Sequence, residues 1–186
     1  FDFGGFIVDG GHSLKSKSSF LPSSASQAKP PQLLAHYDFP DDWEILLVIL
    51  DSKNTVNGQK EVNIFQDYCP VPKNEVEQTS HIIFMNMIPF LLERDLPAFG
   101  HSIDEIQKRG FKNVEVSLQS QQIRDLMDKL REIGAYGVGM SSFGPTVYSV
   151  FDKNNKHIVE EIKEYVGDRG TVLTTKAQNY GHEIQK

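Results

Sequence analysis

The feature that most constrains the fold of this chain is a helix that leads into a glycine-rich segment and then into a strand. In Gln122–Ile133, apolar residues recur at helical spacing and charged residues fill the other positions, which predicts an amphipathic helix with one buried face. Gly134 then ends the helix. The residues Gly134–Val150, here called the glycine-rich run, read GAYGVGMSSFGPTVYSV, and Thr146–Phe151 at its end alternates as a strand.

The middle of the glycine-rich run predicts a loop that binds an anion. Its glycines permit positive φ and close approach by a ligand, and hydroxyl groups beside them can donate hydrogen bonds to a phosphate. The candidate phosphate- and substrate-binding residues here are Gly137, Gly139, Ser141, Ser142, Gly144 and Thr146. A capped helix and a tight turn explain the same glycines without a ligand. The run matches neither a P-loop nor a Rossmann motif, because it follows a helix and precedes a strand.

A second candidate site lies near the start of the chain. Phe3–Val8 is apolar and predicts a strand, and the sequence Asp9-Gly10-Gly11-His12 follows it in a loop. Asp9 and His12 are candidate catalytic residues, as a base or as metal ligands, and Gly10 and Gly11 are candidate substrate-binding residues. Asp–Gly and Gly–Gly are also common turn sequences, so a purely structural role stays open.

Composition narrows the classes of function. The 186 residues are 39% hydrophobic and carry a formal charge of −6 without a continuous basic stripe, which disfavours nucleic acid as a partner. The longest apolar stretch, Ile82–Leu92, is interrupted by Asn86 and Pro89 and is too short to span a membrane. The single cysteine, Cys69, excludes an intramolecular disulfide, and the histidines lack the spacing of a zinc site. We therefore expect a cytoplasmic protein with no membrane partner.

The remaining pattern predicts an α+β fold. A serine- and proline-containing segment, Ser13–Pro31, predicts a flexible linker or a surface loop. We place a domain boundary there and divide the chain into residues 1–31 and 32–186. Asn113–Leu118 is either a strand or the start of a helix. The further strands expected are Glu44–Leu50 and Thr171–Thr175, and the further helices are Glu75–Leu92 with a break at Pro89, Ile103–Lys108 and Asn155–Val166.

The glycine-rich run resembles the third, C-terminal motif of the GHMP superfamily, in which a Gly-Ala dipeptide after a helix leads into a glycine loop and a strand. Where the kinases of that superfamily continue in consecutive glycines, this chain has MSSFGP, which departs from the kinase pattern. The chain resembles instead the archaeal branch of beta-ribofuranosylaminobenzene 5'-phosphate synthases. The segments that carry this resemblance are Gly139–Thr146 (GMSSFGPT), Gly4–His12 (GGFIVDGGH), Trp43–Ser52, Glu61–Pro72 and Ser80–Gly100.

The resemblance implies a fold and a reaction. Residues 32–186 would form the ferredoxin-like α/β sandwich of a C-terminal GHMP domain, and residues 1–31 would hold the last strand region of the N-terminal domain and the linker. The rest of that N-terminal half, including the phosphate loop of the family, would precede Phe1, so we expect the chain to be inactive alone. The enzyme would be a homodimer that condenses phosphoribosyl pyrophosphate with a hydroxy- or aminobenzoate, using Mg²⁺ and releasing pyrophosphate and carbon dioxide in methanopterin biosynthesis.

Two alternatives from other classes stay open. A GHMP-type kinase would place the same loop beside a nucleotide phosphate and transfer phosphate from ATP to a small molecule. A non-catalytic module for ligand binding or oligomerisation would have the same layered fold without any reaction.

Overall fold

The structure is a computed structural model that describes residues 2–11, 21, 30–51, 56 and 58–183. The chain forms two compact units. Unit 1 comprises Phe1–Phe39, Asn57–Pro70 and Ala177–Lys186, and unit 2 comprises Pro40–Val56 and Val71–Lys176. Most of the predicted linker falls on residues 12–20 and 22–29, outside the described residues. The division into 1–31 and 32–186 therefore stays a prediction.

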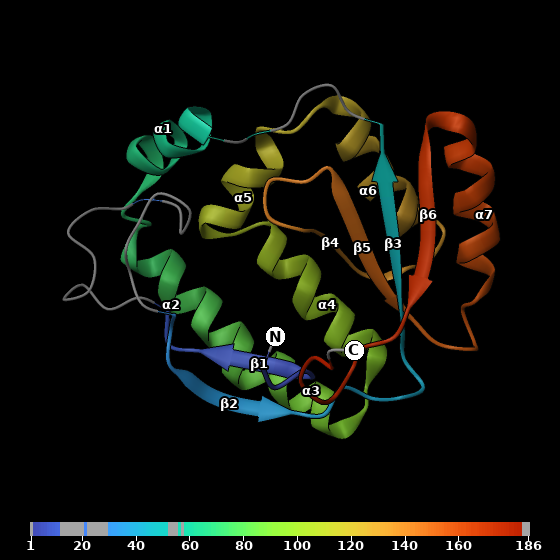
Figure 1. The fold of residues 1–186 in the computed structure, drawn as a ribbon, viewed down its shortest axis with the longest axis horizontal. Coiled ribbons are helices and arrows are strands. Elements are labelled where there is room, and N and C mark those ends of the chain that lie inside the picture. Colours follow the sequence, from blue (N-terminus) through green and yellow to red (C-terminus); the bar gives the residue numbers. More distant parts are fainter. Residues whose placement is uncertain (1, 12–20, 22–29, 52–55, 57, 184–186) are drawn as a thin grey trace. The chain divides into compact units, whose positions relative to one another are not determined.

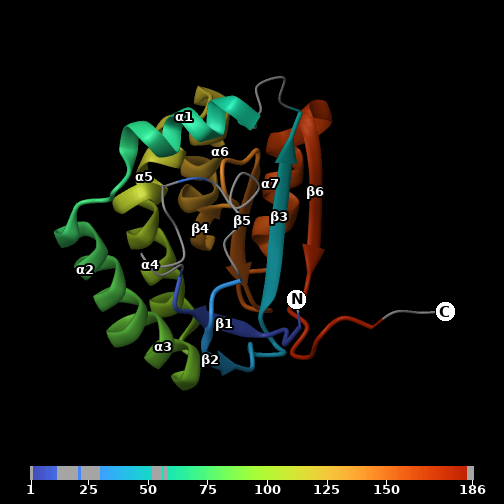
Figure 2. The ribbon, with the colours of Figure 1, turned by 60° about the vertical axis from the view of Figure 1, so that its left-hand side comes forward.

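Unit 1 contains a two-stranded antiparallel sheet and a helix. β1 (Phe6–Asp9) pairs with β2 (Leu33–Tyr37), and α1 (Gly58–Tyr68) is the helix; the two strands lie side by side in Figure 2. The strand expected over residues 3–8 is confirmed over residues 6–8 only: residues 3–5 precede the strand, and it continues to Asp9. Before it, Gly4 has a φ of +69°, and a Cβ there would meet the carbonyl oxygen of Gln178 at 2.4 Å, so only glycine fits.

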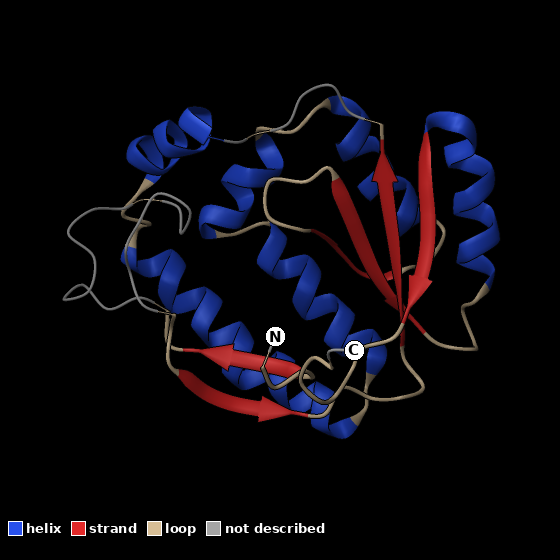
Figure 3. Ribbon diagram, viewed as in Figure 1, coloured by secondary structure: helices blue, strands red, loops and turns tan. Residues whose placement is uncertain are grey.

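Unit 2 contains a four-stranded antiparallel sheet in the order β4-β5-β3-β6. Along the chain the strands alternate with helices as strand, helices, strand, strand, helix, strand (Figures 1 and 3), which is the ferredoxin-like topology. The predicted α+β sandwich is therefore confirmed. The strands are β3 (Glu44–Leu50), β4 (Tyr136–Met140), β5 (Thr146–Phe151) and β6 (Gly170–Thr175).

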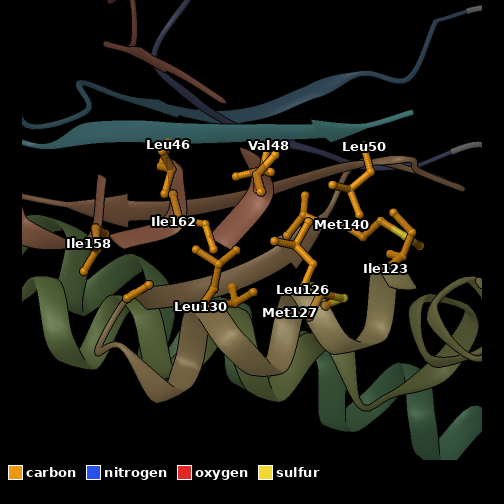
Figure 4. Close-up of a cluster of buried hydrophobic side chains, with 14 of the residues drawn as sticks. Leu46, Val48, Leu50, Ile123, Leu126, Met127, Leu130, Met140, Ile158 and Ile162 are labelled. Carbon is orange, nitrogen blue, oxygen red and sulfur yellow. The ribbon is translucent and has the colours of Figure 1, made fainter. Parts of the chain in front are cut away.

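The core of unit 2 lies between one face of this sheet and two helices, α6 (Gln121–Glu132) and α7 (His157–Val166). Figure 4 shows Leu46 and Val48 of β3 pointing toward Leu126 and Leu130 of α6. All four side chains have 0% relative exposure. Burial of one such side chain stabilises the fold by about 1.5–3 kcal/mol, so this layer holds both helices against the sheet.

The connection from β3 to β4 contains further helical segments. The expected break at Pro89 was wrong: the helix continues through a π-helical turn, and Pro89 lies in the first turn of the next segment. Proline has no N–H to donate, and the wider turn accommodates that loss without ending the helix. Asn113–Leu118 proves to lie largely in a helix. The segments are α2 (Lys73–Ile82), η2 (Ile83–Met87), α3 (Ile88–Glu93), α4 (Leu96–Gln107) and α5 (Gly110–Ser117).

Among the described residues, no helix combines the length and the apolar character needed to cross a membrane.

Candidate functional site

The glycine-rich run divides into a strand and a turn. The structure places Gly137 and Gly139 in β4, so the expectation that the predicted loop begins before them was wrong. The loop is the shorter segment Ser141–Pro145, here called the β4–β5 turn, which joins the two strands beside α5 (Figure 3). Glycine has a low propensity for β-strands, so the sequence did not indicate β4. The pairing of β4 with β5 is also irregular between Tyr136 and Gly139.

The two glycines of β4 make room for neighbouring groups. A Cβ on Gly137 would lie 2.8 Å from Ile103 Cδ1 and 2.9 Å from Gly100 Cα, both on α4. A Cβ on Gly139 would lie 2.4 Å from Cζ of the Tyr148 ring. Contacts this short are not tolerated, so both positions need glycine for packing. A ligand-binding role for these two glycines stays a prediction.

Side chains of α4 hold the outer edge of β4. Asp104 Oδ1 accepts a hydrogen bond from the backbone N–H of Val138 at 3.2 Å, and Gln107 Oε1 accepts one from Met140 at 3.1 Å. Arg131 Nε donates to Asp104 at 3.1 Å, which fixes that carboxylate. An edge strand normally leaves such N–H groups free, so these contacts set the position of β4 and of the turn that follows it.

The β4–β5 turn is closed by its own backbone. The N–H of Ser141 donates to the carbonyl of Thr146 at 2.9 Å, and the N–H of Gly144 donates to the carbonyl of Ser141 at 2.8 Å. Ser142 has a φ of 47° and Gly144 a φ of 70°, so both lie in the left-handed region. Glycine adopts that conformation freely, whereas serine needs support from its surroundings. Ser141 and Ser142 are exposed.

That support comes from side chains that sequence analysis did not identify. Lys112 Nζ donates to the carbonyl oxygens of Met140 at 3.2 Å and Ser142 at 3.4 Å. Gln119 Nε2 donates to the carbonyl oxygen of Phe143. These residues belong to no motif and lie more than twenty positions before the turn, so the sequence offered no signal for them. The carbonyl group of Met140 at the end of β4 and those of Ser142 and Phe143 in the turn are therefore held by α5 and by the residue Gln119 that follows it.

Two consecutive N–H groups of the turn are left available. Within the described residues, the N–H groups of Ser142 and Phe143 have no hydrogen-bond partner. Successive N–H groups in a turn with a left-handed residue form a concave site that suits an anion. The exposed hydroxyls of Ser141 and Ser142 lie in the same turn. The structure thus brings together Ser141, Ser142 and Gly144, with Thr146 at the start of β5, but not Gly137 or Gly139.

The second candidate site, in unit 1, forms an Asx-turn, which is a turn closed by a hydrogen bond to an aspartate side chain. Asp9 Oδ1 accepts a hydrogen bond from the N–H of Gly11 at 2.8 Å, and the N–H of Gly10 donates to the carbonyl of Gln32 at 2.9 Å. Gly11 has a φ of +61° with open space around it. His12 lies outside the described residues. Asp9 is exposed and accounted for as a turn residue, and the catalytic roles of Asp9 and His12 stay predictions.

Within the part of the chain that the structure describes, no three His, Cys, Asp or Glu side chains gather closely enough to hold a metal ion. The described residues therefore do not form a side-chain cage for Mg²⁺, and this cofactor stays a prediction.

A depression of about 570 Å³ in unit 2 has no residue of the β4–β5 turn in its lining. It is lined by charges of both signs, including Asp104, Lys108, Asp128 and Arg131. Arg131 already pairs with Asp104 at 3.1 Å and with Asp128 at 3.0 Å. None of the residues that the sequence predicted for a site lines this depression.

Tyr148, which lies partly buried beside β4, has a raised pKa. Burial is the main cause, and the negative charge of Asp104 adds to it. The phenol that fills the space at Gly139 is therefore neutral over the physiological range.

Comparison with known proteins gives consistent results. Residues 87–170 match the family model "GHMP kinases C terminal". The chain is 50% identical over 181 residues to beta-ribofuranosylphenol 5'-phosphate synthase of Methanothermobacter thermautotrophicus, covering 97% of this chain and 55% of that protein. It is 45% identical over 188 residues to the protein of the same name from Archaeoglobus fulgidus, covering 100% of this chain and 58% of the relative. The chain thus spans a little more than half the length of these curated relatives.

A similar fold occurs in a solved structure of homoserine kinase from Cytophaga hutchinsonii. The TM-score is 0.65 at 14% identity, and the match covers 96% of this chain and 50% of that one. At this identity the likeness concerns the fold alone.

Proposed function

Because this chain belongs to the GHMP superfamily, we propose that it is the C-terminal part of a beta-ribofuranosylphenol 5'-phosphate synthase. Identities of 50% and 45% that extend over nearly the whole chain support this proposal. The name of these relatives specifies a phenol, which favours a hydroxybenzoate over an aminobenzoate as the acceptor. The aromatic acid, phosphoribosyl pyrophosphate and a place in methanopterin biosynthesis are parts of the same proposal.

The proposed reaction forms one carbon–carbon bond. The ring carbon that carries the carboxylate attacks C1′ of the ribose, and the bond from C1′ to the diphosphate breaks as diphosphate leaves. The carboxylate then leaves as carbon dioxide, and its bonding electrons restore the aromatic ring. No net proton is gained or lost. Such a reaction needs hydrogen-bond donors that stabilise the departing diphosphate.

We assign that task to the β4–β5 turn. The observation that carries the assignment is the pair of adjacent N–H groups of Ser142 and Phe143, which lack a partner within the described residues. They lie beside the exposed hydroxyls of Ser141 and Ser142. Backbone donors held in advance stabilise developing negative charge without reorganisation during the reaction. Gly144 permits the turn, and Thr146 closes it through its carbonyl oxygen.

Asp9 and His12 are proposed as the acid–base pair. Removal of the proton from the acceptor hydroxyl would raise the electron density of the ring carbon that attacks. A carboxylate or imidazole can accept that proton and return it to the hydroxyl of the product. The adjacent Gly10 and Gly11 would let the substrate approach the backbone closely. Mg²⁺ would enter with the donor, because a diphosphate supplies the oxygen ligands that this ion prefers. A cytoplasmic homodimer completes the proposal.

Turnover by the full-length protein tests the proposed function. Phosphoribosyl pyrophosphate and a hydroxybenzoate should give one diphosphate and one carbon dioxide for each molecule of ribosylated phenol, measured by phosphorus NMR and by trapped labelled carbon dioxide. Phosphate transfer from ATP to a small alcohol, without decarboxylation, would favour the kinase alternative. A folded protein that turns over neither set of substrates would favour the non-catalytic module.

A further inference from the structure

We propose that Lys112 of α5 is a positioning residue that supports the β4–β5 turn and fixes the direction of the N–H of Phe143, one of the two free N–H groups there. The identity of the anion that these groups bind rests on the proposed function, whereas the positioning itself does not. Lys112 would thus serve the ligand without touching it.

The contacts of Lys112 account for every donor that it has. A lysine ammonium has three protons to donate. Its acceptors here are the carbonyl oxygens of Met140 and Ser142, at 3.2 and 3.4 Å, and the carboxylate of Glu115. The side chains of Lys112 and Glu115 are only 23% and 10% exposed. With three acceptors for three protons, no donor is left for a ligand.

Because the peptide bond is planar, a contact that fixes a carbonyl group also fixes the direction of the N–H group in the same peptide. In a trans peptide the C=O and the next N–H point in opposite directions. Because the carbonyl of Ser142 points toward Lys112, the N–H of Phe143 must point away from it. Gln119 acts in the same way on the next peptide: it holds the carbonyl of Phe143, and the N–H of Gly144 turns back to the carbonyl of Ser141.

The ring of Phe143 anchors the same turn to α5. Phe143 is 5% exposed and packs edge to face on Phe111 of α5, with the ring centroids 6.0 Å apart. Lys112 follows Phe111 directly in sequence. One segment of α5 therefore holds both the backbone and the side chain of the turn, which is the arrangement expected of a support for a binding loop.

The test uses variants of the full-length protein. Lys112→Met removes all three donors at nearly constant length, and Lys112→Gln keeps one donor group in case the first variant folds poorly. Lys163→Met is the matched control, because Lys163 pairs with Glu160 at 2.9 Å on α7 in the same three-residue spacing but makes no hydrogen bond to the β4–β5 turn. Thermal unfolding of each variant establishes that it is folded.

The first measurement is hydrogen exchange without ligand at the hydrogen-bonded amides of Ser141 and Gly144. We expect exchange about tenfold faster or more in Lys112→Met, an intermediate increase in Lys112→Gln and no change in the control, on the scale of a lost charge-assisted hydrogen bond. Unchanged exchange in a folded Lys112→Met protein would overturn the proposal.

The second measurement is the affinity for inorganic pyrophosphate by calorimetry, which should fall about tenfold in Lys112→Met. Weaker binding with unchanged exchange would identify Lys112 as a direct ligand and overturn its positioning role. Faster exchange in a protein whose wild type binds no pyrophosphate would support the positioning role while contradicting the proposed function, so the two failures are distinguishable.

Discussion

The two parts of the glycine-rich run use glycine for opposite purposes. In β4, Gly137 and Gly139 are surrounded so closely that a single added carbon would meet other atoms within 3 Å. In the β4–β5 turn, Gly144 supplies a positive φ, and the serines before it are exposed. The glycines of the first part let α4 and the Tyr148 ring pack closely on β4, and the second part has two backbone donors without a partner among the described residues.

The difference shows that glycine content alone does not identify a binding loop. The two parts differ in whether their backbone N–H groups have hydrogen-bond partners. Those of Val138 and Met140 in β4 are bonded to Asp104 and Gln107. Those of Ser142 and Phe143 have no partner among the described residues. A ligand can use only the second pair.

The packing role of β4 predicts the largest effect. Gly137→Ala adds a Cβ 2.8 Å from Ile103 at a φ of +60°, so we expect a loss of about 3 kcal/mol in the free energy of unfolding from overpacking together with backbone strain. Gly134→Ala is the control, because Gly134 has a φ of +85° but open space around it, and it should cost only about 1 kcal/mol. Equal losses in chemical denaturation would show that packing does not distinguish β4.

The turn at Asp9 places a pair of glycines beside a carboxylate, and the charge of that carboxylate can be tested separately from the turn. Asp9→Asn keeps an oxygen that can accept from Gly11, so the turn should survive while the charge is lost. If Asp9 takes part in proton transfer, kcat/KM of the full-length enzyme should fall about a hundredfold or more, and His12→Ala should act similarly. Folded variants with wild-type turnover would leave Asp9 as a turn residue only.

The serine hydroxyls of the β4–β5 turn should affect binding but not folding. The double variant Ser141→Ala, Ser142→Ala should bind pyrophosphate about tenfold more weakly, because two donors are lost from an anion site. Its free energy of unfolding should change by less than about 0.5 kcal/mol, since both residues are exposed. Calorimetry measures the affinity and chemical denaturation measures the stability. Unchanged affinity together with a large loss of stability would remove the distinction between strand and turn.

The smallest effect concerns α4, which supports the strand part. The side-chain hydrogen bonds from Lys108 and Arg109 lower the pKa of Glu105 from 4.5 to about 2. A lowered pKa in the folded state stabilises the protein above about pH 4.5, and this contribution is lost as the pH falls toward 2. Glu105→Gln should reduce that pH dependence by less than about 1 kcal/mol. Denaturation curves across this pH range, unchanged by the substitution, would contradict the assignment.

Local sequence patterns predicted the helices and strands in which buried apolar residues recur at regular spacing or in a continuous run. The spacing of Ile123, Leu126 and Leu130 identified α6, and the continuous apolar run of residues 44–50 identified β3 with its observed ends. β4 could not be predicted in this way, because its N–H groups depend on Asp104 and Gln107, 34 and 33 positions away. α1 and β2 were also missed; α1 is largely polar and buries only Ile64.

The same limit applies to the candidate site. The serines and Gly144 of the turn were evident from residue type, since hydroxyls and positive φ follow from sequence. Lys112 and Gln119 were not, because their contacts with the turn span 28, 30 and 24 positions. Sequence thus located the residues that we propose to face the anion, and only the fold revealed the side chains that hold the turn.

The most direct test of the difference between strand and turn is amide exchange in the full-length protein with and without inorganic pyrophosphate. We predict that pyrophosphate slows exchange at Ser142 and Phe143, whose N–H groups it would engage, and leaves Gly137 and Gly139 unchanged. Saturating pyrophosphate that protects the β4 glycines instead, or that leaves Ser142 and Phe143 unprotected, would contradict the assignment of anion binding to the β4–β5 turn.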